Sequence, residues 1–205
     1  GRILGDTIRE QEGAEVFELI ERIRQTSIRF RRDDDLQAKH ELETLLNSLS
    51  PAQSRHVVRA FSYFSHLSNI AEDQHHIRRS RSHALAGSIQ HEGNLAFAIE
   101  KSRSAGIAET AISGFFNQAH IRPVLTAHPT EVSRKSILNC QRLIAGQLEQ
   151  RDRQVLTPDE LMENNEILKS AVLSLWQTRM LRTSKLSVLD EVENGLSFYR
   201  NTFLP

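Results

Sequence analysis

His128 stands directly before Pro129 in the string LTAHPTE of residues 125–131. A residue that precedes proline is pushed out of the α region into extended conformations, so the backbone at His128 should be extended and fixed. Imidazole is the side chain whose ordinary pKa lies nearest neutral pH, and a rigidly held imidazole can take a proton from a reacting group. The pattern therefore makes His128 a candidate general base. A hydrogen-bonded histidine at a strand end, without chemistry, is the equally simple alternative.

Basic and hydroxyl side chains flank this histidine. Arg134 and Lys135 follow it by about two helical turns. A helix that starts near Thr130 would direct its positive N-terminal end toward an anion. These groups could together draw an anion to His128, although exposed helix charges are the alternative, which we favour for Lys135. Thr126 and Thr130 could orient the imidazole ring through hydrogen bonds.

A second concentration of titratable side chains lies between residues 75 and 91. It contains His75, His76, His83 and His91 together with Arg78, Arg79 and Arg81. Adjacent positions of a helix point in different directions, and neither a cysteine nor regularly spaced acids complete a tetrahedral set of metal ligands. We therefore predict no metal site here. A solvated loop, a frayed helix end or a subunit-contact surface is the favoured interpretation.

Length and charge narrow the class of protein. The 205 residues suit one large domain or two small ones. The 26 Lys and Arg balance the 26 Asp and Glu, so the chain lacks the basic field expected of a nucleic-acid binder. Cys140 is the single cysteine, which excludes an intrachain disulfide and fits the cytoplasm. No apolar stretch approaches the ~18–20 residues of a membrane span.

The elements that must position these residues are predicted to be mainly α-helices, with one strand. Apolar residues recur at helical spacing through most of the chain. Ser50 with Gln53, and Thr157 with Glu160, have the spacing of residues that cap helix starts. Trp176 is predicted to be a core anchor. The predicted helices cover 4–30, 36–49, 51 to about 72, 95–102, 109–119, 130 to about 148, 158–180 and 188–203 (weakened at Gly195), and the strand covers 122–127.

Three blocks of the sequence resemble the phosphoenolpyruvate carboxylase family. The block at 124–138, VLTAHPTEVSRKSIL, is similar to the family's histidine signature. The block at 175–203 resembles its W-x-T segment, its D-E segment and an aromatic pair, while 3–13 is a weaker match. These blocks follow the family's order, and TAHPTE is the most specific of the signals. Arg179 departs from the acid often found after W-x-T, and we assign it no role.

The resemblance implies irreversible carboxylation of phosphoenolpyruvate by bicarbonate, which gives oxaloacetate and phosphate and replenishes the citric acid cycle. It makes His128 the catalytic base. It also implies Mg²⁺ or Mn²⁺ as a cofactor, with metal ligands outside this chain. The expected enzyme is a cytoplasmic, allosteric homotetramer whose partners are phosphoenolpyruvate and bicarbonate.

The family's subunit is several times longer than this chain. Its phosphate-binding loops, acidic metal ligands, catalytic lysine and allosteric site have no counterpart in these 205 residues. We therefore expect an inactive N-terminal fragment, truncated at both ends. It would comprise a helical region at 1–120 and a region at 121–205 that holds the histidine motif and the first strand of a helix-surrounded β/α barrel. The alternative is a non-enzymatic helical interaction domain.

Overall fold

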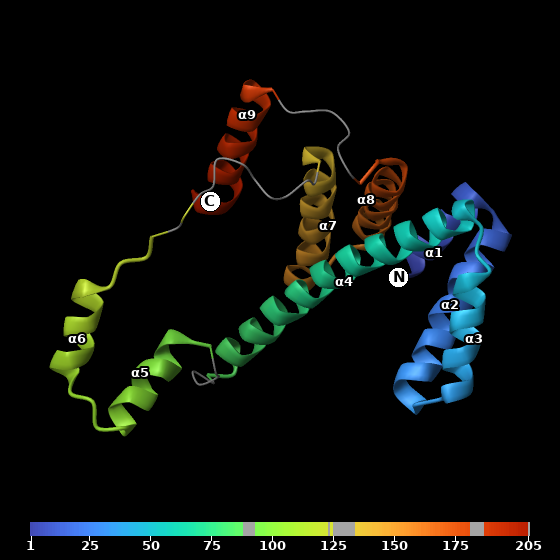
Figure 1. Ribbon diagram of the computed structural model, residues 1–205. Helices are drawn as coiled ribbons and strands as arrows, with labels where there is room; N and C mark the ends of the chain where they lie inside the picture. The colour runs from blue at the N-terminus through green and yellow to red at the C-terminus, as the bar shows by residue number, and fades with distance from the viewer. Residues whose placement is uncertain (88–92, 123, 125–133, 181–186, 205) are drawn as a thin grey trace. The chain divides into compact units, whose positions relative to one another are not determined.

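The computed structural model describes residues 1–87, 93–122, 124, 134–180 and 187–204. Contacts divide the chain into two units, of which one comprises Gly1–Gln74 and Val132–Pro205 and the other His75–Glu131. Both units are built from helices (Figure 1). The prediction of a mainly α chain is therefore confirmed.

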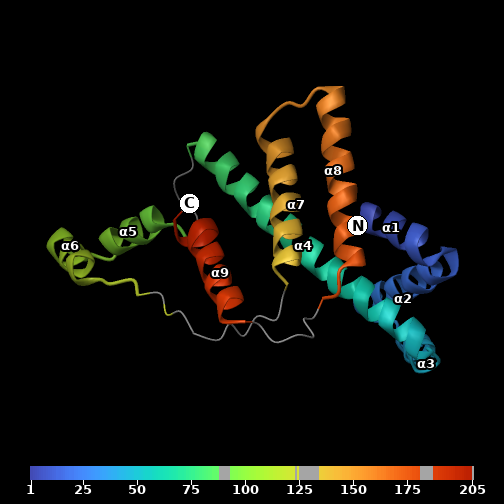
Figure 2. The ribbon, with the colours of Figure 1, turned by 90° about the horizontal axis from the view of Figure 1, so that it is seen from above.

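The larger unit contains two pairs of packed helices. The helices α2 and α3 form one pair, which lies side by side in Figure 1, and α7 and α8 form the other, which lies side by side in both views (Figures 1 and 2). α1 contacts α2 and α8, so it links the pairs. The helices of this unit are α1 (Arg2–Glu12), α2 (Ala14–Asp33), α3 (Leu36–Asn47), the first part of α4 (Pro51–Leu85), α7 (Lys135–Arg153), α8 (Pro158–Gln177), α9 (Val188–Phe198) and a π-helix, η1 (Tyr199–Phe203).

Local capping explains where two of these helices begin. The Glu160 N–H donates to Thr157 Oγ1 at 3.3 Å, and the Thr157 N–H donates to Glu160 Oε2 at 2.8 Å. Ser50 and Gln53 exchange the corresponding pair of hydrogen bonds before α4, at 2.9 and 3.2 Å. Each pair satisfies backbone N–H groups that have no partner within the helix. Both predicted helix starts are confirmed.

Several predicted helix boundaries were wrong. The helix expected at 4–30 is divided by Gly13, whose φ of 91° is accessible to glycine and strained for other residues. α4 continues to Leu85, beyond the expected end near Glu72. α9 passes through Gly195 without a break and ends at Phe198, where η1 follows.

The core of the larger unit lies where α1, α2, α4, α7 and α8 meet. Trp176 and Tyr63 are the largest fully buried side chains, each 1% exposed. The predicted role of Trp176 as a core anchor is thus confirmed. The other buried apolar members of the cluster are Leu4, Ile8, Ile20, Ile23, Val57, Ala60, Ile137, Ile144, Leu168, Ala171, Val172 and Leu175.

The smaller unit contains the end of α4 together with α5 (Leu95–Ser104) and α6 (Glu109–Gln118). Asn94 caps α5 by accepting the Ala96 N–H at 2.7 Å. The predicted strand at 122–127 is not seen: Arg122 and Val124 are exposed and belong to no strand, and the rest of it lies outside the described residues. A strand needs a partner for its backbone groups, and no segment described here supplies one.

Candidate functional site

The structure describes the elements that flank the histidine motif. His128, Thr126 and Thr130 lie outside the described residues, as does the expected helix start near Thr130. The start predicted for this helix, near Thr130, was wrong: α7 begins at Lys135, seven positions after His128, because the N-cap residue Arg134 has extended backbone angles (φ −72°, ψ 143°). The orientation of α7 therefore fixes one end of the segment that carries the motif.

Contacts with the core hold the first half of α7. Ile137 is 3% exposed and belongs to the core cluster. One helical turn later, the Gln141 side-chain amide lies 3.2 Å from Nδ1 of His66 on α4. Burial raises the pKa of Cys140, so its thiol stays protonated at neutral pH. Apolar burial and one polar contact to α4 thus determine how α7 starts.

A buried amide joins the second half of α7 to α8. Asn164 is 2% exposed, and its Nδ2 donates to Gln147 O at 3.0 Å, to Gln147 Oε1 at 2.8 Å and to Gln150 Oε1 at 3.0 Å. Its Oδ1 accepts from Arg151 Nε at 2.6 Å. A buried amide is costly unless its donors and acceptor are satisfied, so this network favours one register of α7 against α8.

Trp176 is surrounded by matched polar groups from α1 and α4. Its Nε1 donates to Glu12 Oε1 at 2.9 Å, and the Arg59 guanidinium lies 4.5 Å from the ring centroid. Tyr63 packs 6.1 Å from the indole and donates its hydroxyl to Thr178 O at 2.7 Å. Burial raises the pKa of Tyr63. The W-x-T segment of the sequence therefore serves as a junction between three helices.

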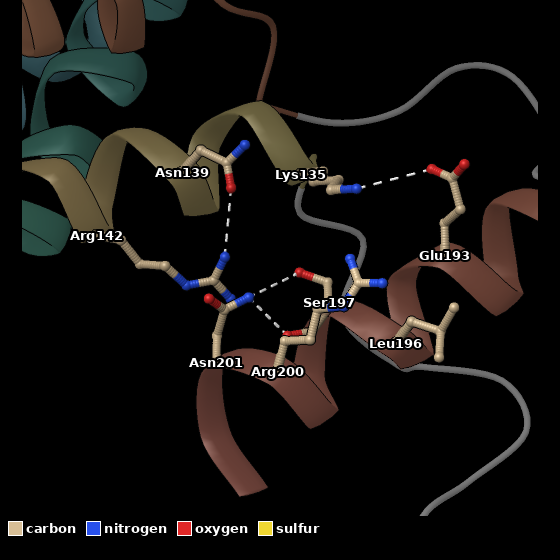
Figure 3. A pocket seen from close by; sticks show the side chains of 8 residues that line it. All are labelled: Lys135, Asn139, Arg142, Glu193, Leu196, Ser197, Arg200 and Asn201. Atoms are coloured by element: carbon tan, nitrogen blue, oxygen red, sulfur yellow. Dashed lines mark hydrogen bonds and ion pairs between the residues drawn. The ribbon is translucent and has the colours of Figure 1, made fainter. Parts of the chain in front are cut away.

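A polar pocket of about 720 Å³ lies between α7 and the α9–η1 segment. Figure 3 shows side chains from the two segments directed toward each other across it. Lys135 Nζ pairs with Glu193 Oε2 at 3.7 Å. Arg142 Nη1 donates to Asn139 Oδ1 at 3.3 Å. The lining residues are Lys135, Asn139, Arg142, Glu193, Leu196, Ser197, Arg200 and Asn201.

Sequence reasoning identified only one residue of this pocket, Lys135, and considered its charge exposed. Lys135, Asn139 and Arg142 follow the spacing of one helical face, as do Glu193, Ser197 and Arg200. Periodicity could have found each face. It could not have shown that the two faces are opposed, because that depends on how distant segments pack.

The remaining predicted features carry no site in the part of the chain that the structure describes. His75, His76 and the arginines that follow are exposed on the last turns of α4, with His75 Nδ1 lying 2.8 Å from Arg78 Nη2. Arg179 is also exposed. Across the described ranges, no group of three His, Cys, Asp or Glu could hold a metal ion. Nor is any helix in these ranges both long enough and apolar enough to cross a membrane.

Comparison with known proteins gives the family. The family model for phosphoenolpyruvate carboxylase matches residues 1–205. Phosphoenolpyruvate carboxylase of Azoarcus sp. (strain BH72) is 63% identical over 205 residues, and the match covers the whole chain and 22% of the relative. The enzyme of Aromatoleum aromaticum is 62% identical over 204 residues and that of Azorhizobium caulinodans 57% over 204, again with 22% of each relative covered. The chain spans about a fifth of these relatives, and it belongs to the phosphoenolpyruvate carboxylase family.

Proposed function

We propose that this chain is part of a phosphoenolpyruvate carboxylase, which combines phosphoenolpyruvate with bicarbonate to give oxaloacetate and phosphate. The observation that carries the proposal is the family match over residues 1–205, with the TAHPTE string at 126–131 inside it. The relatives that share this string's region bear the same enzyme name at 57–63% identity. The remaining parts of the active site would come from polypeptide that this chain does not include.

In the proposed reaction, the phosphoryl group passes from phosphoenolpyruvate to bicarbonate, which gives carboxyphosphate and the enolate of pyruvate. His128 then accepts the proton of the carboxyl group of carboxyphosphate. The deprotonated group breaks its bond to the phosphoryl oxygen, so carbon dioxide and phosphate are released beside the enolate. The enolate carbon attacks carbon dioxide and forms oxaloacetate. His128 must enter this step as a neutral imidazole, because only that form can accept a proton.

The family implies Mg²⁺ or Mn²⁺, which when bound polarises phosphate and stabilises an enolate. The described residues contain no three-residue group that fits such an ion. We therefore propose that the ligands of this metal ion lie elsewhere in the polypeptide. The residues of this chain are given no role in the reaction that depends on the ion. We also propose that 122–127 forms the first strand of a β/α barrel when its partner strands are present, and that the complete enzyme is a cytoplasmic homotetramer.

The test uses the full-length enzyme with His128→Asn. Asparagine keeps a polar side chain but cannot accept a proton at neutral pH, so oxaloacetate formation should fall to background. Oxaloacetate is measured by coupling it to malate dehydrogenase and following the oxidation of NADH. His120→Asn is the matched control, because His120 is exposed and lies eight positions earlier. Wild-type oxaloacetate formation by the His128 variant would exclude it as the base.

A further inference from the structure

Two arginines line the pocket between α7 and the α9–η1 segment. Arg142 projects from α7 and Arg200 from η1 (Figure 3). Neither forms an ion pair with a carboxylate of the described residues. Among the described residues that line the pocket, Glu193 is the one acid, and it pairs with Lys135 at 3.7 Å. The described lining therefore carries three cations and one anion, and no described carboxylate compensates either guanidinium charge.

Two cations that line one pocket favour an anion in the space between them. Like charges that share a partly enclosed space repel each other more strongly than in open water, because the local dielectric is lower. An anion between them would turn this repulsion into attraction. A guanidinium group also presents a planar fork of N–H donors that matches two oxygens of a phosphate or carboxylate.

Neutral groups on both sides of the pocket complement the arginines. The Asn139 carbonyl holds the Arg142 guanidinium through the 3.3 Å hydrogen bond. Asn201 Nδ2 donates to Ser197 O at 2.7 Å and to Ser197 Oγ at 3.2 Å. Since Ser197 Oγ accepts in this contact, its own proton is left to donate to a ligand. One hydroxyl and two guanidinium groups are thus available as donors.

We propose that this pocket binds a phosphate group, with Arg142 and Arg200 as its principal ligands. The site is separate from the proton-transfer role of His128, so either assignment can fail without the other. A cavity of about 720 Å³ exceeds the volume of one phosphate ion, which leaves room for water or for the body of a small phosphate monoester. Free phosphate and a phosphate monoester share the same chemistry, a tetrahedral dianion that two arginines can bind.

The test measures phosphate binding by isothermal titration calorimetry on the full-length protein. The titrants are inorganic phosphate and, separately, methyl phosphate. Every variant is titrated beside the unsubstituted full-length protein, and the site is assigned to the binding event that changes, because binding at the reaction centre is common to both. Arg142→Gln and Arg200→Gln should each weaken one phosphate-binding event about tenfold or more, because each removes a charge-assisted hydrogen bond.

A variant that should increase phosphate affinity distinguishes an effect on this site from a general loss of structure. Glu193→Gln removes the acid that the structure places in the pocket lining and releases Lys135, so it should tighten the same binding event severalfold. Arg153→Gln is the matched control. It lies on α7 but outside the pocket, where it pairs with Glu149 at 2.6 Å, and should leave phosphate affinity unchanged.

Stronger binding of methyl phosphate would identify a monoester as the ligand, and stronger binding of phosphate would identify the free ion. Either result supports the site, provided that the arginine variants weaken it and Glu193→Gln strengthens it. Wild-type phosphate affinity in both arginine variants would overturn the proposal. If Arg142→Gln and Arg200→Gln lower the melting temperature without changing phosphate affinity, the arginines pair with carboxylates elsewhere in the polypeptide, and the proposal is also overturned.

Discussion

The surroundings of Trp176 and the pocket between α7 and the α9–η1 segment use similar polar groups in opposite ways. Around Trp176, Glu12 accepts the indole N–H at 2.9 Å and Arg59 lies over the ring at 4.5 Å. In the pocket, Arg142 and Arg200 face a shared space without a carboxylate between them. Paired groups in a buried setting stabilise a junction of helices, whereas uncompensated charges in an open cavity contribute little to folding and are suited to binding.

This difference predicts that substitutions near Trp176 alter stability, while those in the pocket alter binding. Trp176→Ala should have the largest effect, a loss of about 3–5 kcal/mol in the free energy of unfolding, because it leaves a large cavity and removes the indole N–H that donates to Glu12. The urea midpoint of the full-length protein measures it. Arg179→Ala is the exposed control, and a comparable loss there would contradict the account.

Asn164→Ala should have the second largest effect. It removes a buried amide and leaves the Gln147 and Gln150 acceptors and an Arg151 donor without this partner, at a cost of about 1–3 kcal/mol. Asn165→Ala is the neighbouring control, because Asn165 Oδ1 accepts one hydrogen bond, from Arg151 Nη2. Equal effects of the two substitutions in urea unfolding would show that burial of Asn164 is not decisive.

Tyr63→Phe should have a smaller effect. The substitution keeps the ring that packs against Trp176 and removes only the hydroxyl that donates to Thr178 O at 2.7 Å. A single hydrogen bond of this kind contributes about 1 kcal/mol. Tyr63→Leu, which loses the ring as well, should cost more. A neutral result for Tyr63→Phe in thermal melting would mean that water replaces this hydrogen bond.

Glu21→Gln should have the smallest effect, and the effect should depend on pH. The side-chain hydrogen bonds from Arg24, at 2.6 and 2.8 Å, lower the pKa of Glu21 from 4.5 to about 2. A folded-state pKa below the unfolded value gives stability that is present above about pH 4.5 and is lost as the pH falls toward 2. Because the pair is 32–42% exposed, solvent screening keeps this contribution below about 1 kcal/mol.

The comparison for Glu21 uses urea midpoints at pH 6 and pH 3. Wild-type protein should exceed Glu21→Gln at pH 6, and the difference should shrink at pH 3. Glu15→Gln serves as the control, since Glu15 lies on the same helix and is exposed. A larger difference in urea midpoint between the two proteins at pH 3 than at pH 6 would contradict the role of Arg24.

How much of the fold the sequence could predict depended on how far apart along the chain the interacting residues lie. The starts of α4 and α8 were predictable because Ser50 with Gln53, and Thr157 with Glu160, satisfy backbone groups within one turn. The break at Gly13 was missed because apolar spacing continues across it, while φ decides the conformation. The extension of α4 to Leu85 was missed because its last turns are exposed and so lack an apolar face to mark them.

The candidate sites divide in the same way. His128 was found from a contiguous string, whose chemistry is visible without a fold. The pairing of Arg142 with Arg200 in one pocket could not be found, because it joins residues that are distant in sequence through the packing of two helical segments. Trp176 was predicted as a core residue, but its contacts with Glu12 and Arg59 required the structure.

The most direct test of the proposed function measures phosphate and oxaloacetate in the same reaction of the full-length His128→Asn enzyme. The account predicts phosphate without oxaloacetate, because carboxyphosphate still forms before the step that needs His128. Water then hydrolyses carboxyphosphate to phosphate and bicarbonate, and the enolate takes a proton and leaves as pyruvate. The wild-type enzyme should release the two products in equal amounts. Equal amounts of both from the variant, at the wild-type rate, would contradict the assignment of His128 as the base.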